Sequence, residues 1–312
     1  MKKDSRKFSQ ECEFSSASLS YGKANVKIEV QEYNPQLEPR VEWCVGGRHF
    51  YSTDCAKCFA DLKFSVARTA IYETGSGAHA LKLASPEHLA PVFLMWPTRR
   101  FVVDVACNGE GDQGKVAEVP LMDGSALPFF SELRRNVGVP GELAFYDAPV
   151  HASWDLIRTD VADSAQAQKP YGSVKITPSE AFEVEYILER NEGGCTFRSA
   201  ANVSIFSAED LYNIFTARTF ILKNEFDEAR KAGLLSGVDS SCGLLLGESV
   251  TGVENSRLYR VQEEPARHKI LDLLGDLCFI KPKLPKVRLE IINGGHLSHR
   301  TILEKVLPYA LQ

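Results

Sequence analysis

The sequence has little that would indicate a nucleic-acid-binding, membrane-spanning or disulfide-bonded protein. Its 36 basic residues are outnumbered by 41 acidic ones, and the formal net charge is −5, whereas nucleic-acid binding normally requires a basic surface. The longest clean apolar run, at 89–96, is far shorter than the ~20 residues of a membrane-spanning helix. No apolar segment follows the basic start of the sequence, so we expect no signal peptide and a cytoplasmic protein. We expect contact with a membrane surface only through a lipid that the protein handles.

The eight cysteines are scattered along the chain, and without a secretory signal we expect reduced thiols rather than a disulfide framework. One group could bind a metal, because Cys44, His49, Cys55 and Cys58 lie within fifteen residues. Structural zinc sites usually have two close pairs of ligands, and here only Cys55 and Cys58 form such a pair. A zinc knuckle and a set of incidental thiols therefore both stay open.

Length and composition predict two domains of α+β class. The 312 residues, of which 44% are apolar and 25% charged, suffice for two domains with cores of their own. Predicted strands and helices occur in both halves without a regular β-α-β alternation, which favours α+β over a doubly wound sheet. The composition changes near Pro149, so we predict an N-terminal domain at 1–149 and a C-terminal domain at 150–312.

Hydrophobic periodicity and cap residues predict the individual elements. Ser85 is a natural N-cap and Pro86 suits the first helical position, so we expect a helix over 85–96. The Gly-rich charged stretch at 108–115 predicts a loop. The same reasoning predicts helices at 125–138, 207–217 and 265–279, a helix within 226–235 that ends at Gly233, and a turn leading into a C-terminal helix over 294–311. It predicts strands at 25–33, 100–107, 182–190 and 287–294, and strands broken by a polar turn at 151–180.

The segment ARHKILDLLGD at 266–276 combines the apolar residues of a buried helix with polar residues four apart. His268 and Asp272 would be neighbours on one helix face, an arrangement by which a helix presents two ligands to one metal. A surface pair is the simpler interpretation of such spacing. A catalytic zinc ion takes three protein ligands and keeps one position open, so a third ligand would have to come from elsewhere.

Two short segments could complete such a site. Glu87 and His88 are adjacent, and neighbouring helical residues point ~100° apart, so His88 could bind a metal while Glu87 acts as general base on a water. His296 follows two glycines after a predicted strand and is a candidate general acid, because its unperturbed pKa lies near neutrality. Asp276 could pair with His296 and hold it protonated. A turn histidine without catalytic role remains the alternative for His296.

These same segments resemble the UDP-3-O-acyl-N-acetylglucosamine deacetylases, the zinc enzymes of lipid A synthesis. The resemblance is strongest in the helix that contains Arg-His-Lys, an Asp four residues after the His, and Gly-Asp-Leu. Further segments agree in order and spacing, and together they cover most of the chain from about residue 86 onward. The similar segments are 86–89, 120–129, 217–220, 266–277 and 294–307.

The resemblance implies a set of roles and a reaction. It implies one catalytic zinc ion, an acylated UDP-N-acetylglucosamine as substrate, and hydrolysis of the N-acetyl group with release of acetate. It also implies two α+β domains of similar topology, with their helices between two sheets and the active site at the domain junction. By position it implies His88, His268 and Asp272 as zinc ligands, Glu87 as general base, His296 as general acid tuned by Asp276, and Lys269 and Phe220 as residues facing the substrate.

Some segments depart from the family pattern. The family usually has a Gly-x-Gly-x-His-x-Gly stretch where this chain has Ser20 or Tyr21 in place of the His. A strand Thr that is placed near the oxyanion corresponds to Glu185 or Ile187, a His-Pro segment is replaced at 191–199, and a Gly-Ile-Asp-Asn turn is replaced at 97–101. Three functions therefore stay open: this deacetylase, a relative that deacetylates another nucleotide sugar, or a non-catalytic zinc protein that binds a lipid-linked nucleotide sugar.

Overall fold

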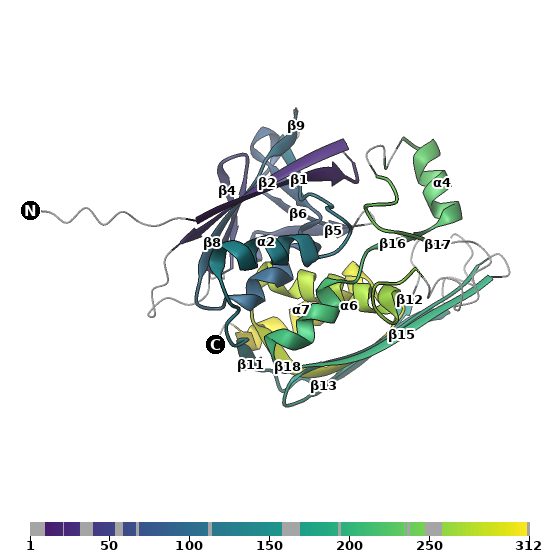
Figure 1. Cartoon of the computed structure of the whole chain (residues 1–312). Coiled ribbons are helices and arrows are strands. Elements are labelled where there is room, and N and C mark those ends of the chain that lie inside the picture. Colours follow the sequence, from purple (N-terminus) through teal and green to yellow (C-terminus); the bar gives the residue numbers. More distant parts are fainter. Residues whose placement is uncertain are drawn as a thin grey trace, which may run out of the picture.

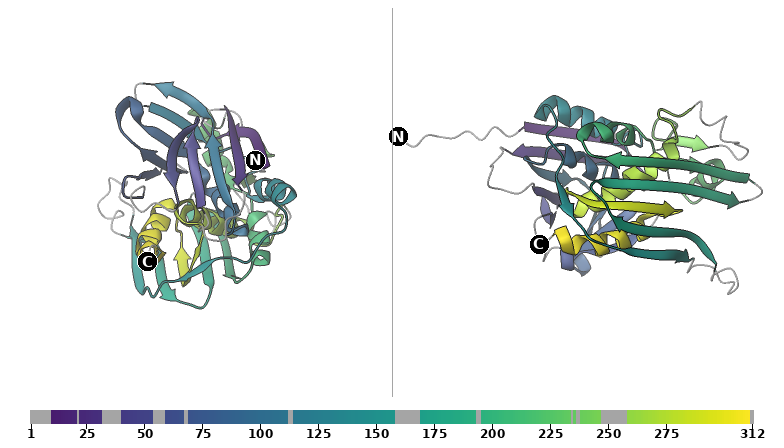
Figure 2. Two further views of the ribbon diagram at one scale, coloured as in Figure 1. Left: turned by 90° about the vertical axis from the view of Figure 1, so that its left-hand side faces the viewer. Right: turned by 90° about the horizontal axis from the view of Figure 1, so that it is seen from below.

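The molecule is layered, with helices between two groups of strands. Figure 1 and Figure 2 show the strands of the first half on one side of these helices and a long sheet of the second half on the other. None of the described helices combines the length and the apolar composition that crossing a membrane would take. The computed structural model describes residues 10–20, 22–31, 40–53, 59–66, 69–111, 114–157, 169–192, 195–233, 235, 238–246 and 258–310.

The first half forms two five-stranded sheets. Their orders are β1-β2-β8-β3-β4 and β5-β6-β7-β10-β9. Most neighbours are antiparallel, but β3 runs parallel to β8, and β7 parallel to β10. In β2 every second side chain is buried while those between are polar, the pattern of a strand with one face on the core. The strands are β1 Gln10–Ser18, β2 Gly22–Gln31, β3 Arg40–Val45, β4 Arg48–Ser52, β5 Lys63–Val66, β6 Ala70–Thr74, β7 Leu81–Ala84, β8 Arg100–Val105, β9 Cys107–Gly111 and β10 Gly114–Glu118.

The second half forms one six-stranded sheet and a small two-stranded one. In the large sheet, of order β12-β13-β18-β14-β15, strand β18 is central, antiparallel to β13 and parallel to β14, and it also pairs with β11. Strands β16 and β17 pair in parallel. The strands are β11 Phe145–Asp147, β12 Ala152–Ile157, β13 Pro170–Pro178, β14 Phe182–Glu192, β15 Cys195–Ile205, β16 Phe220–Leu222, β17 Leu244–Leu246 and β18 Leu284–Ile292.

Helix α6 is the centre of the molecule. All of its residues except Arg267 and Lys269 are buried, which requires packing from every side. Its last turn contacts the first half through Phe279, whose ring stacks on Tyr72 at 4.1 Å between centroids and also contacts Trp43. The helices are α2 Leu127–Val137, α3 Tyr212–Phe215, α4 Lys223–Lys231, α6 Glu264–Ile280 and α7 His296–Ala310, and the 3-10 helices are η1 Gly77–His79, η2 Pro86–His88, η3 Ala90–Met95 and η4 Ala208–Leu211.

The α+β class predicted from the sequence is confirmed, and so are the predicted helices at 125–138, 226–235, 265–279 and 294–311. The loop prediction at 108–115 is wrong where the structure describes it, because β9 and β10 pair as a hairpin there. The helix predicted at 207–217 is a 3-10 turn, η4, followed by the single turn α3. The domain boundary near Pro149 stays a prediction.

The helix predicted over 85–96 is also wrong in type. The segment forms two 3-10 helices, η2 and η3, with Leu89 N–H bonded to the Pro86 carbonyl at 3.1 Å. Pro91 explains the difference, because a proline has no N–H to donate and its ring clashes with the carbonyl four residues earlier. Ser85 occupies the N-cap position, as predicted, but its side chain does not cap the helix. It adopts a left-handed backbone conformation, with φ of 57°, and its side chain makes no cap hydrogen bond.

Candidate functional site

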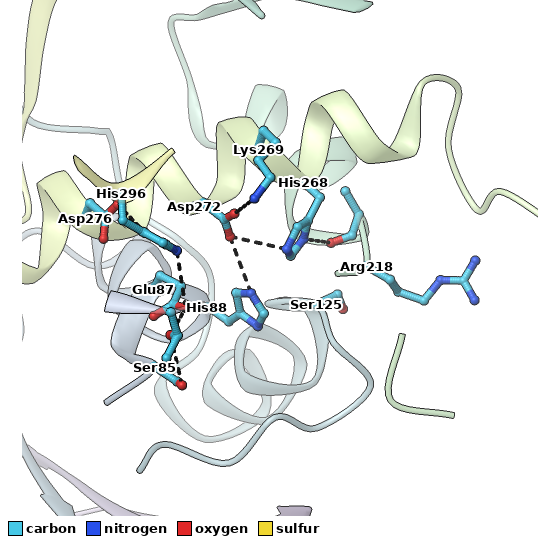
Figure 3. Close-up of polar contacts among 12 residues, drawn as sticks. Ser85, Glu87, His88, Ser125, Arg218, His268, Lys269, Asp272, Asp276 and His296 are labelled. Atoms are coloured by element: carbon cyan, nitrogen blue, oxygen red, sulfur yellow. Dashed lines mark hydrogen bonds and ion pairs between the residues drawn. The ribbon is translucent and has the colours of Figure 1, made fainter. Parts of the chain in front are cut away.

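Helix α6 presents its polar stripe toward η2. His268, Asp272 and Asp276 are each 2 to 3% exposed, and Figure 3 shows them along one side of the helix, with the residues of η2 opposite. The close approach depends on Gly275, where a Cβ atom would lie 2.0 Å from the carbonyl oxygen of Glu87. A glycine in α6 thus brings Glu87 within reach of the stripe.

Three residues from two elements form a compact group of potential metal ligands. The Nε2 atoms of His88 and His268 lie 3.6 Å and 3.3 Å from Asp272 Oδ1, and one ligand atom from each residue lies within 4.8 Å of the others. Two ligands bound ~2.0 Å from a tetrahedral ion are about 3.3 Å apart. The sequence prediction that these three residues come together is therefore confirmed as geometry, and the donor set of two imidazoles and one carboxylate fits a divalent metal ion.

The ring of His268 is fixed for binding through Nε2. Its Nδ1 lies 3.1 Å from the carbonyl oxygen of Ala217, so this nitrogen donates and Nε2 keeps its lone pair. Burial lowers the pKa of His268 to about 3, which keeps the imidazole neutral. The 217–218 backbone is held in turn by Glu264, whose buried carboxylate accepts from Arg218 N–H at 2.9 Å and from Arg218 Nε at 2.8 Å.

Asp272 stays ionised in this group. Burial raises its pKa, but Lys269 and His268 lower it by more, so the net pKa lies well below the usual range. Lys269 Nζ donates to Asp272 Oδ2 at 2.9 Å. The carboxylate therefore uses Oδ2 for the lysine and presents Oδ1 to the two imidazoles.

Glu87 lies beside the group with one carboxylate oxygen held and the other available. Thr69 Oγ1 donates to Glu87 Oε1, while the buried Oε2 has no hydrogen-bond partner among the described residues. Burial raises the pKa of Glu87, and His296 and His88 offset only part of this rise. A buried carboxylate with an unused oxygen and a raised pKa is suited to accept a proton.

His296 lies across from Glu87 at the start of α7. Its Nδ1 is 2.7 Å from Asp276 Oδ2, and its Nε2 is 3.9 Å from Glu87 Oε1. Burial lowers the pKa of His296, but Asp276 and Glu87 raise it by more, to about 9. The predicted pairing of His296 with Asp276 is confirmed, and it leaves a protonated imidazole with Nε2 directed toward Glu87.

The sequence reasoning missed His299. Its Nδ1 lies 2.8 Å from the same oxygen, Asp276 Oδ2, that contacts His296. His299 follows His296 by three residues, a spacing that puts both on one face of α7. That spacing was a signal from which His299 could have been predicted.

An apolar cavity of about 740 Å³ adjoins the site at Phe220. The Phe220 ring lies 6.4 Å from the His268 ring between centroids, and Lys269 Nζ lies 5.7 Å from the Phe220 centroid. Sequence analysis did not predict this cavity, because its walls come from distant segments. They include Leu19, Thr69, Leu121, Ile221, Phe226, Leu235, Val238 and Leu244.

The structure locates two of the residues at which the chain departs from the family pattern, Ser20 and Glu185. Ser20 lines the cavity, and Tyr21 lies outside the described residues. On β14, Glu185 contacts Arg288 at 3.3 Å on the opposite face from Tyr186, whose side chain is fully buried and directed toward α7.

The possible zinc knuckle cannot be assembled from the described residues. Cys44 and His49 lie opposite each other in the register of the neighbouring strands β3 and β4. Cys55 and Cys58 lie outside the described residues, so this prediction stays open.

Comparisons with known proteins agree with the site. The family model described as "LpxC: UDP-3-O-acyl N-acetylglycosamine deacetylase" matches residues 16–308. Similar proteins from three organisms, among others, bear the name UDP-3-O-acyl-N-acetylglucosamine deacetylase. The Thermodesulfovibrio yellowstonii protein is 27% identical over 240 residues, 76% of this chain and 72% of its own. The Synechocystis protein is 27% identical over 270 residues, 83% and 86% of the two chains. The Aquifex aeolicus protein is 24% identical over 225 residues, 72% and 70%.

Proposed function

The chain belongs to the family of UDP-3-O-acyl N-acetylglycosamine deacetylases, and we propose that it hydrolyses the N-acetyl group of a UDP-3-O-(3-hydroxyacyl)-N-acetylglucosamine in lipid A biosynthesis. The main support for this proposal is that Glu87 and His296 face each other across the site. Glu87 Oε1 and His296 Nε2 are 3.9 Å apart, immediately beside three potential metal ligands. A base and an acid on facing elements are what amide hydrolysis requires.

We propose His88, His268 and Asp272 as the ligands of one catalytic zinc ion. Two imidazoles and a carboxylate are a donor set of catalytic zinc sites, and the nitrogen–oxygen separations of 3.3 and 3.6 Å agree with that geometry. When bound, zinc would polarise the amide carbonyl and increase the acidity of water.

The proton transfers belong to this chain's own residues. Glu87 accepts a proton from the attacking water as the new carbon–oxygen bond forms. His296 donates its Nε2 proton to the amide nitrogen as the carbon–nitrogen bond breaks, which releases acetate and the free amine. Asp276 holds Nδ1 of His296 and keeps the imidazolium oriented. Catalysis by such a positioned acid or base is typically worth ~10²–10⁴-fold.

The apolar cavity supports an acylated substrate. A volume of about 740 Å³ lies within the range of ligand pockets, ~300–1,000 Å³, and its walls are suited to a hydrocarbon chain. Phe220 lies between the cavity and His268, and Lys269 projects beside it with a positive charge. We propose that the acyl chain occupies the cavity, that Lys269 contacts the charged part of the substrate, and that any membrane contact is made through the acyl chain.

An acetate-release assay tests the function directly. Zinc-loaded protein should release acetate from UDP-3-O-acyl-N-acetylglucosamine, a chelator should abolish the release, and added zinc should restore it. The matched control substrate is UDP-N-acetylglucosamine without the acyl chain, which should react far more slowly because it leaves the cavity unused. No release by zinc-loaded protein would contradict the proposal and favour another N-acetylated nucleotide sugar or a non-catalytic binding role.

A further inference from the structure

One oxygen of Asp276 is shared by two imidazoles of α7. His296 Nδ1 and His299 Nδ1 lie 2.7 Å and 2.8 Å from Asp276 Oδ2. The other oxygen, Oδ1, is buried and finds no hydrogen-bond partner in the described part of the chain. The two histidines are therefore the groups that fix the plane of this carboxylate.

These separations indicate hydrogen bonds and not a second metal site. The Asp276, His296 and His299 ligand atoms lie close enough together for a metal to be considered. However, ligands of one tetrahedral zinc ion would be about 3.3 Å apart, as in the His88, His268 and Asp272 group. At 2.7 and 2.8 Å, each Nδ1 instead carries a proton directed at the shared oxygen.

The contacts also determine the tautomer of His299. Its side chain is fully buried, and burial lowers its pKa, so the ring is neutral. A neutral ring with a proton on Nδ1 has an acceptor at Nε2, and the hydroxyl of Tyr186 lies 3.5 Å from that atom. Tyr186, His299, Asp276 and His296 thus form a chain of donors and acceptors from β14 to the reacting groups.

We propose that His299 is a positioning residue that holds the Asp276 carboxylate in the orientation by which His296 directs Nε2 toward Glu87. This inference rests on the proposed function. With only His296 bonded to it, the carboxylate could rotate about its side-chain axis and carry the His296 ring away from Glu87. His299 is bonded through the same oxygen from the next turn of α7 and prevents that rotation. It adds no charge, because it is neutral.

The tautomer can be measured without any assay of activity. Zinc-loaded, whole protein containing ¹⁵N-labelled histidine should show His299 as a neutral ring protonated on Nδ1, and His296 protonated on both nitrogens. A His299 protonated on Nε2 would overturn the inference. This test needs no variant, so it does not depend on whether a substitution at a buried site folds.

Two matched variants test the positioning role. In His299→Asn the amide nitrogen takes the place of Nδ1 and can still bond Asp276, whereas in His299→Gln it lies near the place of Nε2 and cannot do so in the same geometry. Loss of a residue that orients a metal ligand typically lowers metal affinity or activity ~10–100-fold, and a fall of similar size would follow from disorienting the His296 imidazole. We expect that fall in kcat for His299→Gln, with KM and zinc content unchanged and with most of kcat retained by His299→Asn. The exposed His151 provides a control, and His151→Gln should behave as wild type.

The outcomes separate the inference from the proposed function. If wild-type protein releases no acetate, the proposed function fails, and the ¹⁵N signals of the His296 ring become the readout of positioning. They should shift in His299→Gln and return toward wild type in His299→Asn. If both variants keep the wild-type kcat, or if His299→Gln leaves the His296 signals unchanged, the positioning role is wrong.

Discussion

Thr69 Oγ1 donates a hydrogen bond to Glu87 Oε1 at 2.5 Å. Ser85 Oγ lies 3.0 Å from the same threonine hydroxyl and 3.3 Å from Glu118 Oε1. Glu118 is buried and also accepts from the backbone N–H of Leu19 at 3.0 Å. The proposed general base is therefore held through one oxygen by a polar chain that extends into the first half, and its second oxygen has no hydrogen-bond partner among the described residues.

Replacing Thr69 by Val removes the donor and keeps the shape of the side chain. A hydrogen bond to a charged group is worth roughly 1.5–3 kcal/mol, so a base that must be re-oriented should lose about ten- to a hundredfold in kcat. Steady-state kinetics with the acylated substrate measures the loss, and metal analysis should show unchanged zinc. Thr69→Ser keeps the hydroxyl and is the matched control. Equal kcat in both variants would show that Thr69 does not orient Glu87.

Substitutions of Glu87 and of His268 should have different effects on zinc content and on turnover. His268→Ala removes one of three ligands, so the purified protein should retain far less zinc. Glu87→Gln leaves all three ligands in place and removes only the proton acceptor, so zinc should remain while turnover falls by ~10²–10⁴-fold. Metal analysis after gel filtration, paired with the acetate-release assay, gives both readouts. Undiminished zinc in His268→Ala would exclude this ligand assignment.

Sequence reasoning succeeded where one element determines the geometry. His268, Asp272 and Asp276 were predicted on one helix face, and α6 places them there because a four-residue spacing repeats on an α-helix. His296 was predicted to meet Asp276, and the two are bonded. The first prediction follows from the period of one helix, whereas the second joins α6 and α7 and came from matching an imidazole with a carboxylate that could hold it protonated.

The rest depends on contacts between distant segments. Tyr186, and neither of its neighbours on β14, points toward α7, because strand neighbours alternate between the two faces of a sheet. The left-handed conformation of Ser85 is not visible in any local pattern. The 3-10 turns after it contact α6, and Pro91 disfavours a continuous α-helix there. The cavity joins Leu19, Leu121 and Leu244, a combination that no local pattern predicts.

We expect kcat to fall both at high pH and at low pH, each time because one catalytic group changes its protonation. His296 must be protonated to donate, and its pKa is raised to about 9, so activity is present below that pKa and is lost as pH rises through it. Glu87 must be ionised to accept, and burial raises its pKa, so activity is lost as pH falls toward that raised value. A bound cation would lower the pKa of both groups, so both falls in kcat would move to lower pH. His296 would still determine the alkaline fall and Glu87 the acidic one.

The alkaline limb offers a specific test through Asp276, whose carboxylate raises the pKa of His296. Asp276→Asn removes that charge, so the imidazolium should lose its proton at lower pH and the alkaline limb should move in that direction. Profiles of kcat for wild type and variant, recorded at saturating substrate, give the comparison. If the limb stays in place, a group other than His296 is responsible for it.

Gly275 should tolerate no side chain, although it lies within a helix. Alanine is favoured over glycine in helices by roughly 1 kcal/mol, so Gly275→Ala would stabilise an isolated α6. Here a Cβ atom would lie 2.0 Å from the Glu87 carbonyl oxygen and 2.5 Å from its Cα. These are backbone atoms, which cannot rotate aside as a flexible side chain can, and overpacking of this kind typically costs ~1–3 kcal/mol or more.

The overpacking at Gly275 should therefore outweigh the gain in helix propensity and also separate η2 from α6. His88 would move with η2 while His268 and Asp272 remain on the helix, so zinc affinity should fall together with the melting temperature. Thermal unfolding and zinc titration of the whole protein measure the two effects. Gly141→Ala is the matched control, because a Cβ atom there meets Pro97 at an ordinary 3.5 Å. A Gly275→Ala protein with wild-type stability and zinc affinity would show that η2 does not rest on α6 at this position.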